Sequence, residues 1–279
     1  MCAIRMPQIY GQTMGMTYTA VFVHAHPDDE ALLTSGTMAD LALRGHRVLL
    51  VVCTDGAEGL AAEVRRGRDL AAIRRRELET SAHALGVTDV RWLGYGDSGL
   101  NADVLPQPDA PTPLVYARRS EVVAALAAIL REVNADVVVG YDPNGGYGHP
   151  DHIAVHEIVY EAAAQAETPR ILEATMPRDE LAKWAHRLRW IKLAFRDFDP
   201  TMFDDAFTPG HQITHRIDVR DLVDVKRDSL RAHASQASGG STPRTVAVLL
   251  KLPVALYKRW FGFEYYVERG AAPGASSVF

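Results

Sequence analysis

The stretch YTAVFVHAHPDDEALLTSGTMADLALRGHRVLLVVCT, residues 18–54, carries the pattern that decides the fold. Residues 18–25 are rich in β-branched and aromatic side chains and predict a strand. Apolar side chains then recur at helical spacing up to Gly45, which predicts a helix over residues 29–45. Residues 46–54 are almost continuously apolar, as expected for a strand that is buried on both faces of a parallel sheet.

The same alternation of strand and helix continues along the chain. The sequence predicts helices over residues 68–86, 119–134 and 152–166, and strands over residues 89–95 and 135–142. Residues 100–115 contain four prolines, which indicates a loop over an edge or a site. Strands and helices joined by short connections are typical of an α/β fold, so we expect a Rossmann-like, mostly parallel sheet flanked by helices.

The C-terminal part has a less regular pattern. Residues 177–191 and 221–236 have the spacing of helices, and residues 211–219 alternate as a strand does. A chain of 279 residues, of which 47% are hydrophobic, can bury one sizeable core. We therefore expect residues 1–16 to be an N-terminal extension and residues 17–279 to form a single domain.

Composition excludes several classes of function. A net charge of −5 and a pI of about 6.1 argue against nucleic acid as a partner. No stretch approaches the ~18 consecutive apolar residues of a membrane span, and the first residues lack the apolar core of a signal peptide. Neither Cys2 nor Cys53 reads as part of a disulfide framework. We expect a cytoplasmic protein that acts on a small molecule; whether it forms a homo-oligomer stays open.

Two clusters of ionisable side chains directly follow predicted strands. HAHPDDE, residues 24–30, follows the first strand, and DPNGGYGHPDH, residues 142–152, follows the strand over residues 135–141. In open α/β sheets, ligands collect beyond the carboxyl ends of the strands, which share one edge of the sheet. The sequence therefore predicts that the two clusters meet at this edge.

The two clusters contain the donors of a metal site. His26 and Asp29 flank a turn at Pro27 and can point at one centre, and His152 can supply a third ligand. Two histidines and a carboxylate leave a position open for water, as in catalytic zinc sites. The same set also suits ferrous iron. We therefore predict a catalytic Zn²⁺ site, with Fe²⁺ as the alternative metal.

Other residues of the clusters have side chains suited to amide hydrolysis. Asp28 is free to act as the general base, and His149 can donate a proton to the leaving amine. Asp151 can orient His149, and Tyr147 can donate a hydrogen bond to the developing oxyanion.

Simpler readings of the same residues exist. Either cluster alone is a weak metal motif, Asp28 or Asp29 can cap the following helix, and the glycines at 145, 146 and 148 can simply shape a turn. GYGDSG, residues 94–99, formally matches a dinucleotide-binding fingerprint, but a proline-rich loop follows where a helix is required. The pairing of two clusters at matching strand ends favours the metal site.

These motifs resemble those of the PIG-L (LmbE-like) superfamily of metal-dependent N-deacetylases. The resemblance rests on AHPDDE at residues 25–30, GHPDH at 148–152 and KRDSLRAHASQ at 226–236. It implies that His26, Asp29 and His152 are the metal ligands and that Asp28 is the base. It also implies that His149 assists the oxyanion or the leaving amine and that Asp151 supports His149.

YDPNGGYGHPDH, residues 141–152, is similar to the branch that deacetylates the glucosaminyl-inositol precursor of mycothiol. In that branch Tyr147 would be a mobile oxyanion contact, and Arg74 and Asp97 would hold the sugar. The resemblance also places His233 near the substrate. Residues 100–119 and 170–212 are not distinctive of this branch, and they would shape the substrate pocket.

The sequence thus predicts a zinc-dependent N-deacetylase acting on an acetamide of a small polar, amino-sugar-containing substrate. One alternative is an amidase or deacetylase acting on a thiol conjugate or a natural-product intermediate. Another is a metal- or sugar-binding module without catalysis. The presence of Asp28 beside Asp29 argues against a mere binding module, because a binding site needs no second carboxylate.

Overall fold

The structure is a computed structural model, and it describes residues 17–59, 68–188, 200–237 and 245–272. Its centre is a seven-stranded sheet with the strand order β3-β2-β1-β4-β5-β7-β6. The strands are β1 Thr19–His24, β2 Arg47–Thr54, β3 Asp89–Tyr95, β4 Val137–Tyr141, β5 Arg170–Thr175, β6 His215–Asp218 and β7 Phe263–Glu268. The predicted mostly parallel α/β sheet is confirmed, because β1 to β5 all run parallel to one another.

Strand order reverses between β1 and β4. The chain builds β1, β2 and β3 outward in one direction and then returns to place β4 on the other side of β1. The loops that follow β1 and β4 therefore diverge at the carboxyl edge and leave a crevice, which is the usual ligand site of such sheets. Both ionisable clusters lie in these two loops.

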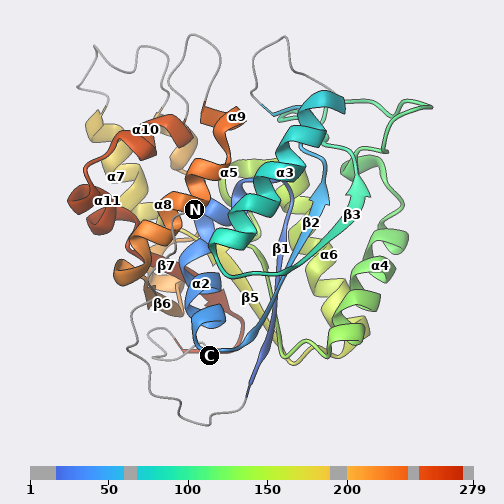
Figure 1. The fold of residues 1–279 in the computed structure, drawn as a ribbon, viewed down its shortest axis with the longest axis horizontal. Coiled ribbons are helices and arrows are strands. Elements are labelled where there is room, and N and C mark those ends of the chain that lie inside the picture. The colour runs from blue at the N-terminus through green and yellow to red at the C-terminus, as the bar shows by residue number, and fades with distance from the viewer. Residues whose placement is uncertain (1–16, 60–67, 189–199, 238–244, 273–279) are drawn as a thin grey trace, which may run out of the picture.

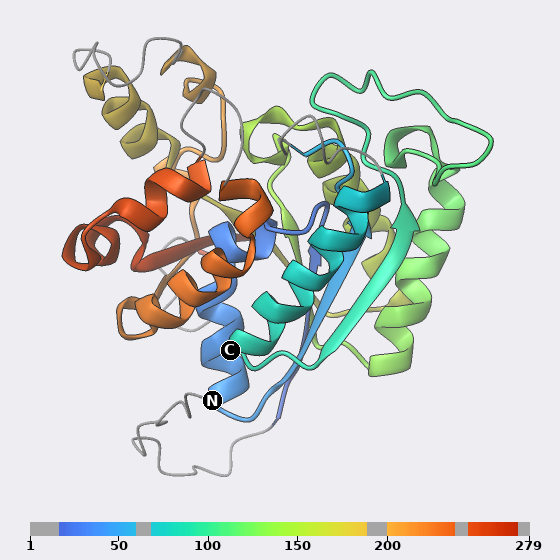
Figure 2. The ribbon, with the colours of Figure 1, turned by 45° about the horizontal axis from the view of Figure 1, so that its top comes forward.

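Helices cover both faces of the sheet (Figures 1 and 2). They are α1 Asp29–Leu33, α2 Ser35–Leu43, α3 Arg68–Ala84, α4 Arg119–Val133, α5 Gly145–Gly148, α6 Pro150–Ala166, α7 Arg178–Leu188, α8 Val223–Ala232, α9 Ala234–Ala237, α10 Thr245–Lys251 and α11 Val254–Phe261. The buried faces of α4 and α6 pack on one side of the sheet, and those of α2 and α3 pack on the other. The helices α1, α8, α10 and α11 share a third apolar cluster.

The predicted helix over residues 29–45 is two helices, α1 and α2. Thr34 separates them with a φ of −134°. Its hydroxyl lies 2.8 Å from His24 Nε2, at the end of β1. A side-chain contact to the sheet therefore interrupts a segment whose apolar spacing alone predicts a continuous helix.

The C-terminal part differs more from the prediction. Strand β7 was not predicted; it pairs antiparallel with β5 and with β6. The predicted strand over residues 211–219 starts only at His215, after a 3₁₀ turn. The predicted helix over residues 221–236 is interrupted at His233, between α8 and α9. Residues 1–16 and 189–191, which were predicted to be an extension and a helix end, lie outside the described residues.

The prediction of a single domain over residues 17–279 remains a prediction. Across the part of the chain that the structure describes, every helix is too short or too polar to cross a bilayer.

Candidate active site and metal centre

The two loops at the crevice bring three predicted ligand atoms together. His26 Nδ1 lies 3.2 Å from His152 Nε2. Asp29 Oδ2 lies 3.5 Å from His26 Nδ1 and 3.3 Å from His152 Nε2. All three side chains are buried. His26 comes from the loop after β1, Asp29 is the first residue of α1, and His152 comes from the first turn of α6.

This triangle fits a metal ion. Ligand atoms at ~2.1 Å from a tetrahedral zinc lie about 3.4 Å from one another, close to the three observed separations. His149 brings a further ring nitrogen, since the ligand atoms of His26, His149 and His152 all lie within 4.8 Å of one another. A divalent cation is well suited to this set of donors, because two imidazole nitrogens and a carboxylate oxygen point toward one buried position.

Carboxylates surround His26 on its other side. Asp97 Oδ1 lies 3.4 Å from His26 Nε2, and Asp151 Oδ2 lies 3.1 Å from the same nitrogen. Burial disfavours the imidazolium, but Asp97, Asp151 and Asp29 together raise the pKa of His26 well above its ordinary value. Three buried carboxylates thus face the single ring of His26, and this concentration of negative charge favours a bound cation.

Asp151 does not orient His149 as we expected. Its carboxylate accepts a hydrogen bond of 2.9 Å from Ser98 N and contacts His26 Nε2. Only its backbone N–H reaches His149, at Nδ1. A carboxylate accepts but does not donate, so the contact places a proton on His26 Nε2, and Nδ1 is the nitrogen that a metal ion would bind once it displaces the second proton.

His149 is a neutral ring in this environment. Burial, together with His26 and His152, lowers the pKa of His149 to about 4. At neutral pH this imidazole lacks the extra proton that the predicted role as an acid requires. It is suited to accept a hydrogen bond or to bind a metal.

Asp28 occupies an unusual backbone position beside the ligands. Its φ is 126° and its ψ is −20°. Burial raises the pKa of Asp28 to about 6, although Arg74 opposes this shift. Arg74 Nη2 lies 3.1 Å from Asp28 Oδ1. A carboxyl group with this pKa can exchange a proton near neutral pH, as a general base must.

The loop that carries Tyr147 is shaped by Asp142. Its Oδ1 accepts hydrogen bonds of 3.0 Å from Asn144 N and from Gly146 N. Gly146 has a φ of 66° and a ψ of −101°, a conformation that favours glycine. Tyr147 is 42% exposed, and its ring centroid lies 5.2 Å from that of His152. Its hydroxyl can therefore reach solvent or substrate at the edge of the site.

The three residues predicted to bind substrate, Arg74, Asp97 and His233, are all buried. Arg74 donates to Gly56 O at 2.6 Å and to Pro27 O, and Asp97 accepts from Gly99 N at 2.9 Å. The structure contradicts a direct substrate contact for His233, because its ring is fully buried and its Nε2 lies 2.6 Å from Glu30 Oε1. Sugar binding by Arg74 and Asp97 stays a prediction.

The sequence reasoning missed Tyr141 as a residue of the site. Its hydroxyl donates to Asp29 Oδ2 at 2.7 Å, and its ring stacks on that of His152 with centroids 4.2 Å apart. The sequence does mark Tyr141: it is the one aromatic residue in the run VVVGY, residues 137–141, and it directly precedes the second cluster.

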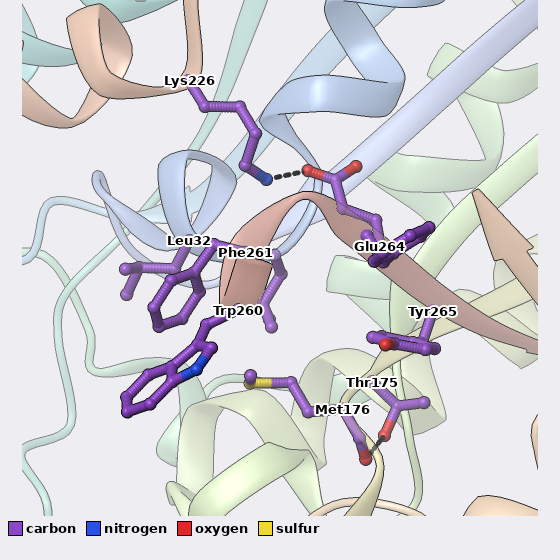
Figure 3. A pocket seen from close by; sticks show the side chains of 10 residues that line it. Leu32, Thr175, Met176, Lys226, Trp260, Phe261, Glu264 and Tyr265 are labelled. Carbon is purple, nitrogen blue, oxygen red and sulfur yellow. Dashed lines mark hydrogen bonds and ion pairs between the residues drawn. The ribbon is translucent and has the colours of Figure 1, made fainter. Parts of the chain in front are cut away.

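An apolar cavity lies at the carboxyl end of β5, one strand away from the metal point (Figure 3). It has a volume of about 270 Å³, including the space at its mouth. Leu32, Met176, Trp260 and Tyr265 are among its lining residues, and the ion pair between Lys226 and Glu264 forms part of its wall. None of the predicted site residues lines this cavity.

Comparison with known proteins places the site in a family. Residues 21–163 match PIG-L, the family described as GlcNAc-PI de-N-acetylase. A 1D-myo-inositol 2-acetamido-2-deoxy-alpha-D-glucopyranoside deacetylase from Acidothermus cellulolyticus is 37% identical, over 92% of this chain and 91% of the relative. An enzyme of the same name from Thermobifida fusca is 38% identical, over 80% of this chain and 84% of the relative.

A solved structure has the same architecture. The N,N'-diacetylchitobiose deacetylase from Pyrococcus horikoshii matches with a TM-score of 0.56 and 27% identity, over 90% of this chain and 82% of that one. The matching motifs, the geometry at the β1–β4 crevice and the three comparisons agree, and the chain belongs to the PIG-L family.

Proposed function

We propose that the chain is a metal-dependent N-deacetylase that hydrolyses the acetamide of a small polar substrate containing an amino sugar. The observation that carries the proposal is the triangle of His26 Nδ1, Asp29 Oδ2 and His152 Nε2, with separations of 3.2–3.5 Å. The names of the relatives point to an acetamido-glucosaminyl-inositol as the substrate.

His26, Asp29 and His152 would hold the metal, with zinc as the first choice and ferrous iron as the alternative. A divalent ion there supplies Lewis acidity toward the amide carbonyl and lowers the pKa of water. The residues around it do the rest: Asp151 holds His26 in the tautomer whose Nδ1 is free, and Tyr141 orients Asp29.

Asp28 is the residue that transfers the proton. Its carboxylate accepts a proton from the attacking water and, with a pKa of about 6, can return that proton to the leaving amine. Tyr147 lies at the exposed side of the site, where its hydroxyl can donate a hydrogen bond to the developing oxyanion.

The test is acetate release by protein loaded with one equivalent of Zn²⁺ or Fe²⁺. The substrates are N-acetylglucosaminyl-inositol, N-acetylglucosamine and a set of larger amides, including a thiol conjugate. We expect the fastest release from N-acetylglucosaminyl-inositol. Faster hydrolysis of the thiol conjugate would favour the amidase, and no acetate from any amide with metal bound would favour a binding module.

A further inference from the structure

Asp28 has a backbone conformation that its neighbours must hold in place. Its φ of 126° is far from those of the other described non-glycine residues with positive φ, which lie between 49° and 57° (Ala102, Asn134, Glu167 and Phe207). Those φ values belong to the left-handed helical region, which residues with a side chain can adopt. A φ of 126° lies outside that region. Such a conformation costs free energy and persists only where the surrounding structure enforces it.

Two buried side chains form hydrogen bonds with the peptide group between Pro27 and Asp28. Glu30 Oε2 accepts a hydrogen bond of 3.0 Å from Asp28 N. Arg74 donates from Nη2 to Pro27 O, at the opposite end of the same peptide group. With both polar ends of this plane bonded, the rotation that sets φ of Asp28 is fixed.

Glu30 is itself held by a distant segment. The other carboxylate oxygen, Oε1, lies 2.6 Å from His233 Nε2 and accepts a hydrogen bond of 2.6 Å from Ser81. Ser81 in turn contacts Ser229 of α8 at 2.7 Å. Glu30, Ser81, Ser229 and His233 are all fully buried. The chain from His233 through Glu30 to the amide of Asp28 is therefore continuous.

We propose that Glu30 and His233 are positioning residues that hold the Pro27–Asp28 peptide group in the orientation that aims the Asp28 carboxylate. The C-terminal motif over residues 226–236 then acts on the reaction through the backbone of the base and not through the substrate. This inference rests on the proposed role of Asp28 as the base.

The same segment offers a matched control. Ser235, two residues beyond His233, donates from its backbone N and its hydroxyl to Glu77 at 2.7 and 2.6 Å. Ser235→Ala removes the two hydrogen bonds of the Ser235 hydroxyl, one to Glu77 and one from Gln236, without touching Glu30. A purely structural role of the segment predicts similar effects for Ser235→Ala and His233→Ala.

The test compares His233→Ala, His233→Gln and Ser235→Ala, each loaded with zinc. We expect His233→Ala to lower kcat about 10²-fold, because a small misplacement of a reacting group is that costly, with KM and zinc affinity unchanged. His233→Gln keeps a donor toward Glu30 and restores most of kcat, and Ser235→Ala stays near the wild type. A crystal structure of His233→Ala should show Asp28 relaxed to a negative φ.

Several outcomes would overturn the inference. They are a wild-type kcat in His233→Ala, an unchanged φ of Asp28 in its crystal structure, or a loss of zinc affinity as large as the loss of kcat. If His233→Ala fails to fold, Glu30→Asp replaces it, since the shorter carboxylate cannot span His233 and Asp28 N. If the wild type releases no acetate, the proposed function fails, but crystal structures of the wild type and of His233→Ala still test whether His233 holds Asp28 at its positive φ.

Discussion

The Tyr141 hydroxyl donates a hydrogen bond of 2.7 Å to Asp29 Oδ2, the oxygen that faces the two proposed histidine ligands, His26 and His152. The same hydroxyl accepts a hydrogen bond of 2.8 Å from Ala25 N. Because its ring also stacks on His152, a single side chain at the end of β4 contacts two proposed metal ligands, one from each side of the crevice. Such partners behind metal ligands commonly set metal affinity.

Removing this hydroxyl should weaken metal binding. Tyr141→Phe keeps the ring stacked on His152 but leaves Asp29 Oδ2 with only its hydrogen bond from His26 N, so we expect zinc affinity to fall about 10–100-fold. The change also leaves Ala25 N without its acceptor, which should lower the free energy of unfolding by about 1–3 kcal/mol. Competition with a chromophoric chelator measures the affinity. Tyr160→Phe, which loses a hydrogen bond to Glu173 instead, is the control; equal zinc affinity in both variants would refute the role of Tyr141.

Neutralising Asp28 should separate catalysis from metal binding. In Asp28→Asn we expect acetate release to fall about 10²–10⁴-fold, the usual contribution of a general base. Zinc content should be unchanged, because Asp28 is not among the proposed ligands. Asp40→Asn, which removes an ion pair with Arg44 on α2, should keep full activity. Near-normal turnover in Asp28→Asn, with zinc bound, would show that another group takes the proton.

Asp28 should also make the stability of the metal-free protein depend on pH. Burial raises its pKa to about 6, above the ~3.9 of an unfolded aspartate. Between these values the folded state holds a proton that the unfolded state has lost, so this group's contribution to stability falls as pH rises. Asp28→Asn lacks this titration, and its stability relative to the wild type should rise from about pH 4 to about pH 7. Urea unfolding in chelator measures it; parallel curves would mean that the native pKa is not raised.

Asp151 offers a test between two assignments. Its carboxylate lies 3.1 Å from His26 Nε2, so Asp151→Asn should weaken zinc binding about 10-fold through His26. If Asp151 served His149 instead, as the motif suggested, kcat would fall while zinc affinity stayed the same. Ser98→Ala keeps the backbone N–H that bonds to Asp151 and should bind zinc as the wild type does. Isothermal titration with Zn²⁺ distinguishes these results.

Local patterns were sufficient for much of this protein. The alternation of buried strands and amphipathic helices predicts the parallel sheet, because each pattern reflects which faces are buried. Two clusters at strand ends predict a shared site, because parallel strands end at one edge. His26, Asp29 and His152 could be named for this reason alone.

Other features depend on contacts that no local pattern records. β7 enters the sheet between β5 and β6, where it pairs with strands that lie far from it in the sequence. His233 reads as a possible substrate ligand in its motif, but α8 turns it toward Glu30.

By itself the sequence determined the fold class, the edge that carries the site and the three ligand candidates, because these follow from periodicity and short turns. Only the tertiary structure decided which partner each buried side chain takes: Asp151 with His26, Tyr141 with Asp29, and Glu30 with His233. A buried polar atom must pair with whatever the packing brings within about 3 Å, and sequence spacing does not contain that distance.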